Sequence, residues 1–315
     1  MLNRRYLRIK VYQALYAFWQ SDGGSAAKVE KEMFVSIERT FDLYVQLMLI
    51  FGELHRIAGN RILDRRQKHL PTAQDLAPNM RFVENPVLVL LSESKRLLAE
   101  SEKRKLGWMG QGDMLTRLYK EFEESEAFKQ YMAAPSTSFN KDQEVILRLF
   151  LDHISDFEPL HDYCESKSIF WLEDLDLACS LVKRSIETLK AGDTELALSD
   201  LEREPKEERE FVTTLYRKSI DLGEEHEKEI AAKAANWEAD RIALSDMILM
   251  KMALAEVKCF DQIPTKVTMN EYIEIAKAYS TPKSKNFING ILDKLFIEGK
   301  GSGTIKKVGR GLLES

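Results

Sequence analysis

Apolar residues recur every three to four positions along most of this chain, and this spacing predicts an all-α protein. The first predicted helix spans about 4–19, with apolar residues at helical spacing, namely Leu7, Val11, Ala14, Leu15 and Phe18. A long helical pattern runs from about Ala26 to Arg66, and two shorter ones follow at about 87–105 and 113–133. No alternation of apolar and polar residues is long enough to build a sheet.

Prolines and glycines mark the breaks between these helical patterns. Three prolines make 70–86 a predicted linker, and the Pro-Ser-Thr-Ser sequence at 135–138 is a second break. From Asn140 onward the chain carries a weak pseudo-repeat, in which Trp171-x-x-Asp174 recurs as Trp237-x-x-Asp240. An apolar helix follows each copy, so the pattern indicates two similar helical hairpins.

The last part of the chain contains three predicted helices. The most apolar one, about Ser245–Lys258, has almost no polar face and is expected at the centre of a bundle. Thr268 followed by Glu271 forms a capping-box pattern for the next helix, and Ser284 is a favourable N-cap for the last one. Residues 299–315 are rich in Gly and Lys and are expected to form a flexible basic tail.

The composition is that of a soluble globular protein, with 44% hydrophobic and 31% charged residues and only 15 Gly and 8 Pro among 315 positions. No apolar run approaches the roughly 20 residues that a membrane-spanning helix needs, and the basic N-terminus lacks a signal-peptide pattern. Three widely spaced cysteines do not suggest a disulfide framework. A cytoplasmic location without membrane association is therefore expected.

The net charge of −5 conceals two basic ends. Residues 1–10 carry a charge of +4 and residues 299–315 carry +3, which leaves −12 for the remainder. An acidic protein does not bind nucleic acid through its overall charge, but it can do so through local basic segments.

The sequence contains no recognisable catalytic motif: a phosphate-binding Gly loop, GxSxG, HExxH and CxxC are all missing. We therefore expect neither an enzyme nor a cofactor. Glu158-x-x-His161, close to His153 and Cys164, has the spacing of a carboxylate-bridged metal site. A helical bundle needs a second such motif, which is missing, and Pro159 interrupts the first. Surface residues are the preferred interpretation, and no metal is expected.

The first basic cluster is on the first predicted helix. Six residues share about one third of its circumference beside the apolar flank: Arg4, Arg5, Arg8, Tyr12, Tyr16 and Trp19. Arginine binds phosphates, and tyrosine offers a flat surface to unpaired bases. Solvated charges with half-buried tyrosines are the alternative interpretation.

The second basic cluster is at the start of the last predicted helix, where Lys283 and Lys285 flank Ser284. Positive charge at a helix start is unfavourable by a few tenths of a kcal/mol unless an anion binds there. Tolerated loop lysines are the alternative. If the two basic clusters lie side by side, they form one groove for a nucleic-acid backbone.

The segment Gln262–Lys294 closely resembles the NusB family of bacterial transcription antitermination factors. The matching residues are Pro264, Lys266, Val267, Asn270, Glu271, Ile275, Ala276, Lys277, Ser284, Phe287, Asn289, Gly290, Leu292, Asp293 and Lys294. A second match consists of Arg4, Arg5 and the Gln-Ala-Leu-Tyr sequence at 13–16. The resemblance covers the first helix and about Phe211–Lys294.

This resemblance implies an all-helical, non-catalytic protein that binds single-stranded boxA RNA together with NusE, a small-subunit ribosomal protein. Such proteins join the RNA polymerase elongation complex and promote ribosomal RNA transcription. With the two basic clusters, it gives these candidate RNA-binding residues: Arg4, Arg5, Arg8, Tyr12, Lys283, Ser284, Lys285, Asn286 and Phe287. Tyr16 and Asp246 fall where the family contacts NusE.

Three features depart from the family pattern. Tyr6 interrupts the arginine run, Lys283 replaces a residue that is often acidic, and about 190 residues separate the first helix from the C-terminal match. We therefore predict a first helix (1–20), an inserted helical region (21–205), a C-terminal NusB-like part (206–298) and the tail (299–315). The sequence leaves open whether the insertion enlarges the bundle, adds a partner surface or covers the usual one.

Two other functions compete with this prediction. RNA cytosine methyltransferases also contain NusB-like domains, but they need a Rossmann-like domain with a catalytic Cys, and only 21 residues follow Lys294 here. The second alternative is a helical protein-interaction scaffold without RNA binding. A titration with RNA distinguishes this scaffold from the antitermination factor.

Overall fold

The computed structural model describes residues 4–21, 24–198, 205–234 and 242–313. Within these ranges the chain forms helices and connecting turns without a strand, which confirms the predicted all-α class. The chain divides into two compact units. Unit 1 combines Met1–Ile37 with Asp200–Ser315, and unit 2 is the continuous segment Glu38–Ser199.

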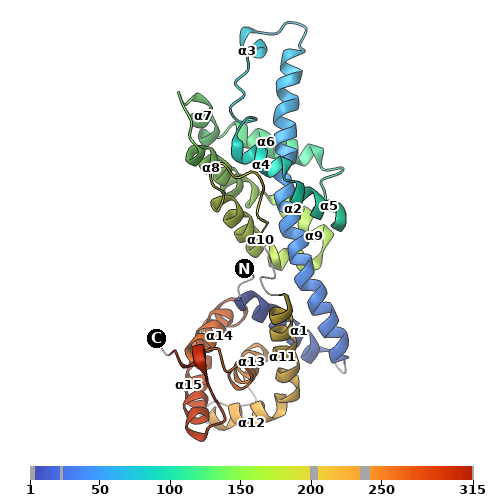
Figure 1. Ribbon diagram of the computed structural model, residues 1–315. Helices are drawn as coiled ribbons and strands as arrows, with labels where there is room; N and C mark the ends of the chain where they lie inside the picture. Colours follow the sequence, from blue (N-terminus) through green and yellow to red (C-terminus); the bar gives the residue numbers. More distant parts are fainter. Residues whose placement is uncertain (1–3, 22–23, 199–204, 235–241, 314–315) are drawn as a thin grey trace. The chain divides into compact units, whose positions relative to one another are not determined.

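Unit 1 is a helical bundle built around one central helix. Its elements are α1 (Arg4–Gln20), the first part of α2 (Ala26–Arg66), α11 (Pro205–Asp221), α12 (Gly223–Lys233), α13 (Leu244–Cys259), α14 (Thr265–Tyr279), α15 (Ser284–Ser302) and the short 3-10 helix η3 (Gly309–Leu312). Helix α13 packs against α1, α11, α12, α14 and α15, which surround it (Figure 1). Its segment 248–257 is buried throughout, as its nearly all-round apolar pattern predicts.

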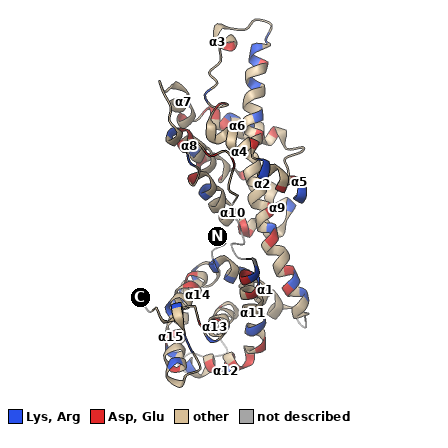
Figure 2. Cartoon of the chain, viewed as in Figure 1, with Lys and Arg blue, Asp and Glu red and all other residues tan. Residues whose placement is uncertain are grey.

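Unit 2 contains the remainder of α2 and a series of shorter helices. These are α3 (Ala73–Leu76), α4 (Pro86–Glu93), α5 (Lys95–Arg104), α6 (Gly112–Glu123), α7 (Glu126–Ala133), α8 (Phe139–Arg148), the π-helix η1 (Leu149–Ile154), α9 (Glu158–Lys167) and α10 (Ile169–Glu187). The central part of α2 supplies much of the core through Leu43, Leu47, Phe51 and Leu54. Basic and acidic residues are interspersed along the helices of both units (Figure 2).

Serine side chains explain two breaks that the apolar periodicity did not reveal. The predicted helices 87–105 and 113–133 are each divided in two, at Ser94 and at Ser125. In each case the serine hydroxyl accepts a hydrogen bond from a backbone N–H in the first turn of the following helix. This local bond stabilises a new helix start, while the apolar spacing continues across the break.

Two predicted helix caps are wrong. Helix α14 begins at Thr265, three residues before Thr268, and the Thr268 hydroxyl bonds to the carboxylate of Glu256 instead of capping the helix. Helix α15 begins at Ser284 itself, whose hydroxyl contacts the hydroxyls of Ser280 and Thr281. In both cases a tertiary or turn contact takes the hydroxyl that the local sequence pattern assigned to the backbone.

The proposed pseudo-repeat is described only in part. In the first copy, the Trp171 indole donates a hydrogen bond to the backbone oxygen of Arg39 (3.0 Å), and Asp174 accepts one from Thr40 (2.6 Å). Trp237 and Asp240 of the second copy lie outside the described residues. The first copy therefore anchors α10 to α2 within unit 2.

Candidate nucleic-acid interface

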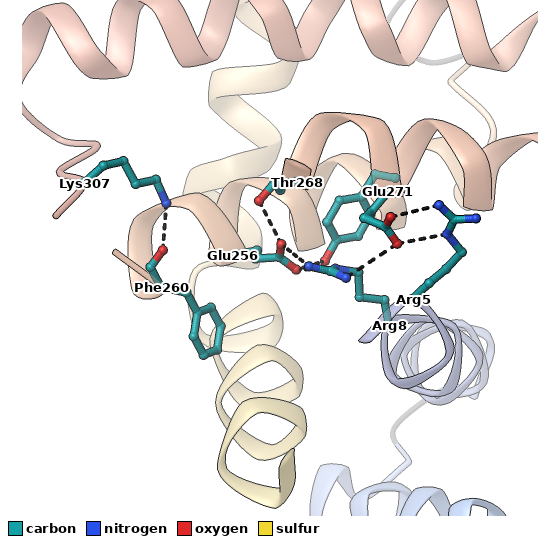
Figure 3. Close-up of polar contacts among 8 residues, drawn as sticks. Arg5, Arg8, Glu256, Phe260, Thr268, Glu271 and Lys307 are labelled. Atoms are coloured by element: carbon teal, nitrogen blue, oxygen red, sulfur yellow. Dashed lines mark hydrogen bonds and ion pairs between the residues drawn. The ribbon is translucent and has the colours of Figure 1, made fainter. Parts of the chain in front are cut away.

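The best-defined polar cluster of unit 1 joins α1 to α13 and α14. The Arg8 guanidinium donates two hydrogen bonds of 2.7 Å to Glu256, and the two side chains are 2% and 0% exposed. Glu256 also accepts a hydrogen bond from Thr268 (2.8 Å; Figure 3) and another from Tyr272 (3.1 Å). Burial alone would lower the pKa of Arg8, but the attraction and hydrogen bonds of Glu256 raise it. The pair is therefore charged inside the bundle.

This arrangement corrects the prediction that Arg8 is an exposed RNA-binding residue. Both of its hydrogen-bonding edges face protein carboxylates, since its second terminal nitrogen lies 3.6 Å from Glu271. Tyr12 is also buried, with its ring 5.3 Å from that of Tyr279. The flank of α1 that was predicted to bind RNA is thus partly packed against the bundle. The prediction was wrong here because a helical wheel does not show which sector faces the bundle.

Arg4 and Arg5 keep part of their charge at the surface. Arg5 donates hydrogen bonds of 2.9 and 2.8 Å to Glu271, and its side chain is 38% exposed. Arg4 is more open, with 48% of its side chain exposed and Glu207 at 4.0 Å. Its guanidinium lies over the ring of Phe211, 5.4 Å from the centroid. Both cations are available to a phosphate from the solvent side.

Helices α1 and α14 run side by side in the same direction. Arg5 contacts Glu271 in the middle of α14, and Tyr12 contacts Tyr279 at its end. The seven residues from Arg5 to Tyr12 correspond to about 10 Å along a helix. Tyr16 follows one turn later, with 38% exposure and its ring 6.1 Å from that of Tyr12.

The start of α15 is held near the same end of α14. The Ser280 hydroxyl donates a hydrogen bond to Asp246 at the start of α13 and lies 3.0 Å from the hydroxyl of Ser284, which is buried. The ring of Tyr16 lies beside that of Tyr12, and Tyr12 contacts Tyr279, the residue before Ser280. The two predicted partner-binding residues, Tyr16 and Asp246, are therefore in one region of unit 1. Asp246 is only 6% exposed.

The exposed residues at this helix start are Lys283, Lys285 and Asn286, whereas Phe287 is half-buried. Neither lysine forms an ion pair with a residue that the structure describes. The structure thus places both basic clusters in unit 1, with Arg4 and Arg5 at the start of α1 and the two lysines just after the end of α14. No direct contact between Arg4 or Arg5 and the two lysines is observed among the described residues.

Sequence reasoning missed the acidic and aromatic residues that hold the arginines. Glu256 and Phe211 were not predicted to have a role, and Glu271 was assigned only to a helix cap. One signal was present: Glu256 and Lys251 are charged residues within the mostly apolar segment 248–257, and such positions normally require a partner of opposite charge.

The possible metal site of the sequence is not formed by the described residues, among which no group of three or more potential ligands converges. His161 contacts the backbone oxygen of Ser155 at 2.6 Å, and the ring of His153 packs edge-on against Phe122. Among the described helices, none combines the length and the apolar character that crossing a membrane requires.

Comparison with known proteins identifies the family. The family model described as "NusB family" matches residues 177–296. The chain is 42% identical over 126 residues to the transcription antitermination protein NusB of Salinibacter ruber, covering 39% of this chain and 79% of that protein. It is 43% identical over 106 residues to NusB of Chloroherpeton thalassium, covering 34% of this chain and 50% of that protein. No solved structure shows a significant match.

The fold and the site define an all-helical protein whose first helix packs against its C-terminal helices. The chain belongs to the NusB family. It is larger than its relatives, and most of unit 2 lies before the first residue that the family model matches.

Proposed function

We propose that this chain is a transcription antitermination factor that binds single-stranded boxA-like RNA together with NusE. It would act on the RNA polymerase elongation complex in the cytoplasm and promote ribosomal RNA transcription. The supporting observation is the pair of basic clusters in unit 1: Arg4 and Arg5 on α1, and Lys283 and Lys285 at the start of α15. Both clusters lie on segments that resemble the family.

In this proposal the exposed cations bind phosphates, and Asn286 and Phe287 contact unpaired bases by hydrogen bonding and stacking. Ser284 and Tyr12 are buried under the exposed residues and support them, and Arg8 holds α1 in place. The exposed ring of Tyr16, with Asp246 beside the Ser280 turn, forms the contact for NusE.

The test is a titration of labelled boxA-like RNA, with and without NusE, at several salt concentrations. Four phosphate contacts predict a slope of log K against log salt of about −3 for single-stranded RNA. Arg4→Ala/Arg5→Ala and Lys283→Ala/Lys285→Ala should each remove about half of this slope. The matched control is Lys228→Ala/Arg184→Ala, which removes two exposed cations that form no ion pair with described residues.

A helical scaffold without RNA binding is the second candidate, and the pairing of Arg5 with Glu271 favours it. A cation that is already neutralised by a carboxylate gains less from a phosphate. A salt slope near zero, or equal losses in the cluster variants and the control, would support the scaffold and contradict the RNA-binding proposal.

A further inference from the structure

The segment after α15 folds back onto unit 1 instead of extending into solvent. The sequence predicted a flexible tail from residue 299, but α15 continues to Ser302 and Ile305 is buried. The Ile305 side chain lies against Gly299, where a Cβ atom would come within 2.5 Å of it. The backbone N–H of Ile305 also donates to the Gly299 oxygen (2.9 Å). A glycine in α15 thus makes room for the first anchor.

The second anchor is the end of α13. The Lys307 ammonium donates a hydrogen bond of 2.7 Å to the backbone oxygen of Phe260, just after the last turn of that helix (Figure 3). The N–H of Val308 donates to the oxygen of Asp261 (3.1 Å). A lysine is favourable at this position because a helix C-terminus carries partial negative charge.

Gly311 completes the attachment by close backbone packing. A Cβ atom at this position would lie 1.9 Å from the Asp261 oxygen, so no other residue fits without displacing the segment. We call residues 305–311 the C-terminal strap. Its backbone is fixed through Ile305, Lys307, Val308 and Gly311.

The remaining cations of the strap point outward. Lys306 and Arg310 are exposed, and neither forms an ion pair with a residue that the structure describes. Glu256, the buried carboxylate near the strap, is paired with Arg8, and Asp261 contacts the strap through its backbone oxygen. Two positive charges are therefore held at fixed positions on the surface of unit 1.

The strap is connected to the basic start of α1 through two aromatic residues. The ring of Phe260 lies 4.9 Å from that of Phe211, and the guanidinium of Arg4 lies over Phe211. In Figure 3, Phe260 and Lys307 lie on one side of Glu256, and Arg5 lies on the other. The strap and the start of α1 therefore flank the same buried carboxylate.

We propose that Lys306 and Arg310 extend the RNA-binding surface beyond α1 and bind phosphates of nucleotides that flank the boxA-like core. This inference rests on the proposed function. RNA is favoured over an acidic protein because the strap continues from Arg4 and Arg5, and because fixed cations bind a phosphate backbone without regard to sequence. Holding the strap in advance also lowers the entropy lost on binding.

The experiment compares two RNAs, the boxA-like core alone and the core with single-stranded flanks on both sides, against the full-length protein. Lys306→Ala/Arg310→Ala should weaken binding of the flanked RNA by roughly five- to twentyfold at 0.1 M salt and reduce its salt slope by about 1.4. Binding of the core alone should be unchanged. Lys228→Ala/Arg184→Ala serves again as the control with the same charge change.

Gly311→Ala tests the fixed geometry without removing a charge. It should displace the strap and reproduce the loss on the flanked RNA, with unchanged binding of the core showing that unit 1 is still folded. Equal affinities of the wild type and Lys306→Ala/Arg310→Ala for the flanked RNA would overturn this inference. The proposed function would still stand if Arg4→Ala/Arg5→Ala weakened the core. If a strap variant lost affinity only for NusE, the strap would be a protein contact, and this result would also overturn the inference that the strap binds RNA.

Discussion

Arg8 and Glu256 form a fully buried, bidentate ion pair although 248 positions separate them in the sequence. This pair fixes α1 against α13, and the hydroxyls of Thr268 and Tyr272 complete the coordination of the carboxylate. The exposed cations Arg4 and Arg5 precede Arg8 on the same helix, so the buried pair determines where the surface charges lie.

Removing one partner of this pair should strongly destabilise the protein. Glu256→Gln or Arg8→Met leaves an uncompensated buried charge, and each should lower the free energy of unfolding by about 3–5 kcal/mol. The measurement is urea unfolding followed by circular dichroism. The double variant should cost less than the sum of the two single variants, and strictly additive losses would contradict the pairing.

The burial of His226 predicts that the free energy of unfolding falls in mild acid. His226 is fully buried, and neither ring nitrogen forms a hydrogen bond of regular geometry with a described residue. Burial, helped by the charge of Lys258 and opposed by Glu225, lowers the pKa of His226 to about 4. As the pH falls, His226 therefore binds a proton in the unfolded chain before it does so in the folded protein. Its contribution to the free energy of unfolding is fully present above pH 6.5 and is lost as the pH falls from 6.5 towards 4.

The pKa of His226 falls from its ordinary value of 6.5 to about 4 in the folded protein. This difference corresponds to a loss of about 3 kcal/mol in the free energy of unfolding. Unfolding free energies measured between pH 4 and pH 7 should show the loss, and His226→Phe should abolish the part due to this residue. An identical pH dependence in the variant would refute the role of His226.

Asn85 should be important for the stability of unit 2. It is 1% exposed, its oxygen accepts hydrogen bonds from the N–H groups of Val87 and Leu88, and its amide donates to Tyr131 and to the backbone oxygen of Asp142. Asn85→Ala removes a helix cap and leaves buried groups without partners, which should cost about 2–4 kcal/mol.

Hydrogen exchange can test this prediction directly, since amides of α4 and α8 should lose protection in Asn85→Ala. The control is Asn60→Ala, at an exposed position of α2, which should leave protection unchanged. Similar exchange in both variants would disprove the role of Asn85.

Asp246→Asn separates the charge of Asp246 from its structural bond. The amide oxygen can still accept the hydrogen bond from Ser280, so the turn before α15 should persist. Under the proposed function, NusE binding should weaken about tenfold through the loss of a charge-assisted contact. The affinity is measured by calorimetry, with Glu224→Gln on α12 as the control. Equal affinities of the two variants would exclude a charge contact at Asp246.

Local pattern was sufficient to predict much of the fold. Helix α2 has the bounds Ala26–Arg66 that its periodicity predicted, and α13 spans Leu244–Cys259 where Ser245–Lys258 was expected. These segments are long and strongly apolar on the faces that they bury, and the signal is strongest in such helices.

The exposure of individual side chains on α1 could not be predicted in the same way. Arg8 and Tyr12 share a sector with Arg4 and Tyr16, but their neighbours belong to α13 and α14, more than two hundred residues later. Helical spacing gives angles around an axis and contains no information about which distant carboxylate will face a given sector. The strap was missed for the same reason. Its anchors are tertiary contacts at Gly299 and Gly311, and a glycine-rich sequence by itself suggests a flexible tail.

Unit 1 is assembled from two ends of the sequence, and this has a consequence for its synthesis. Unit 2 is continuous, so it can fold while the ribosome is still translating the rest of the chain. Helix α1 emerges first, yet Glu256 is made 248 residues after Arg8. At 5–20 residues per second this delay is roughly 12–50 s. During that time the apolar flank of the nascent α1 has no native partner in α13, so native packing of α1 must follow translation of the C-terminal helices.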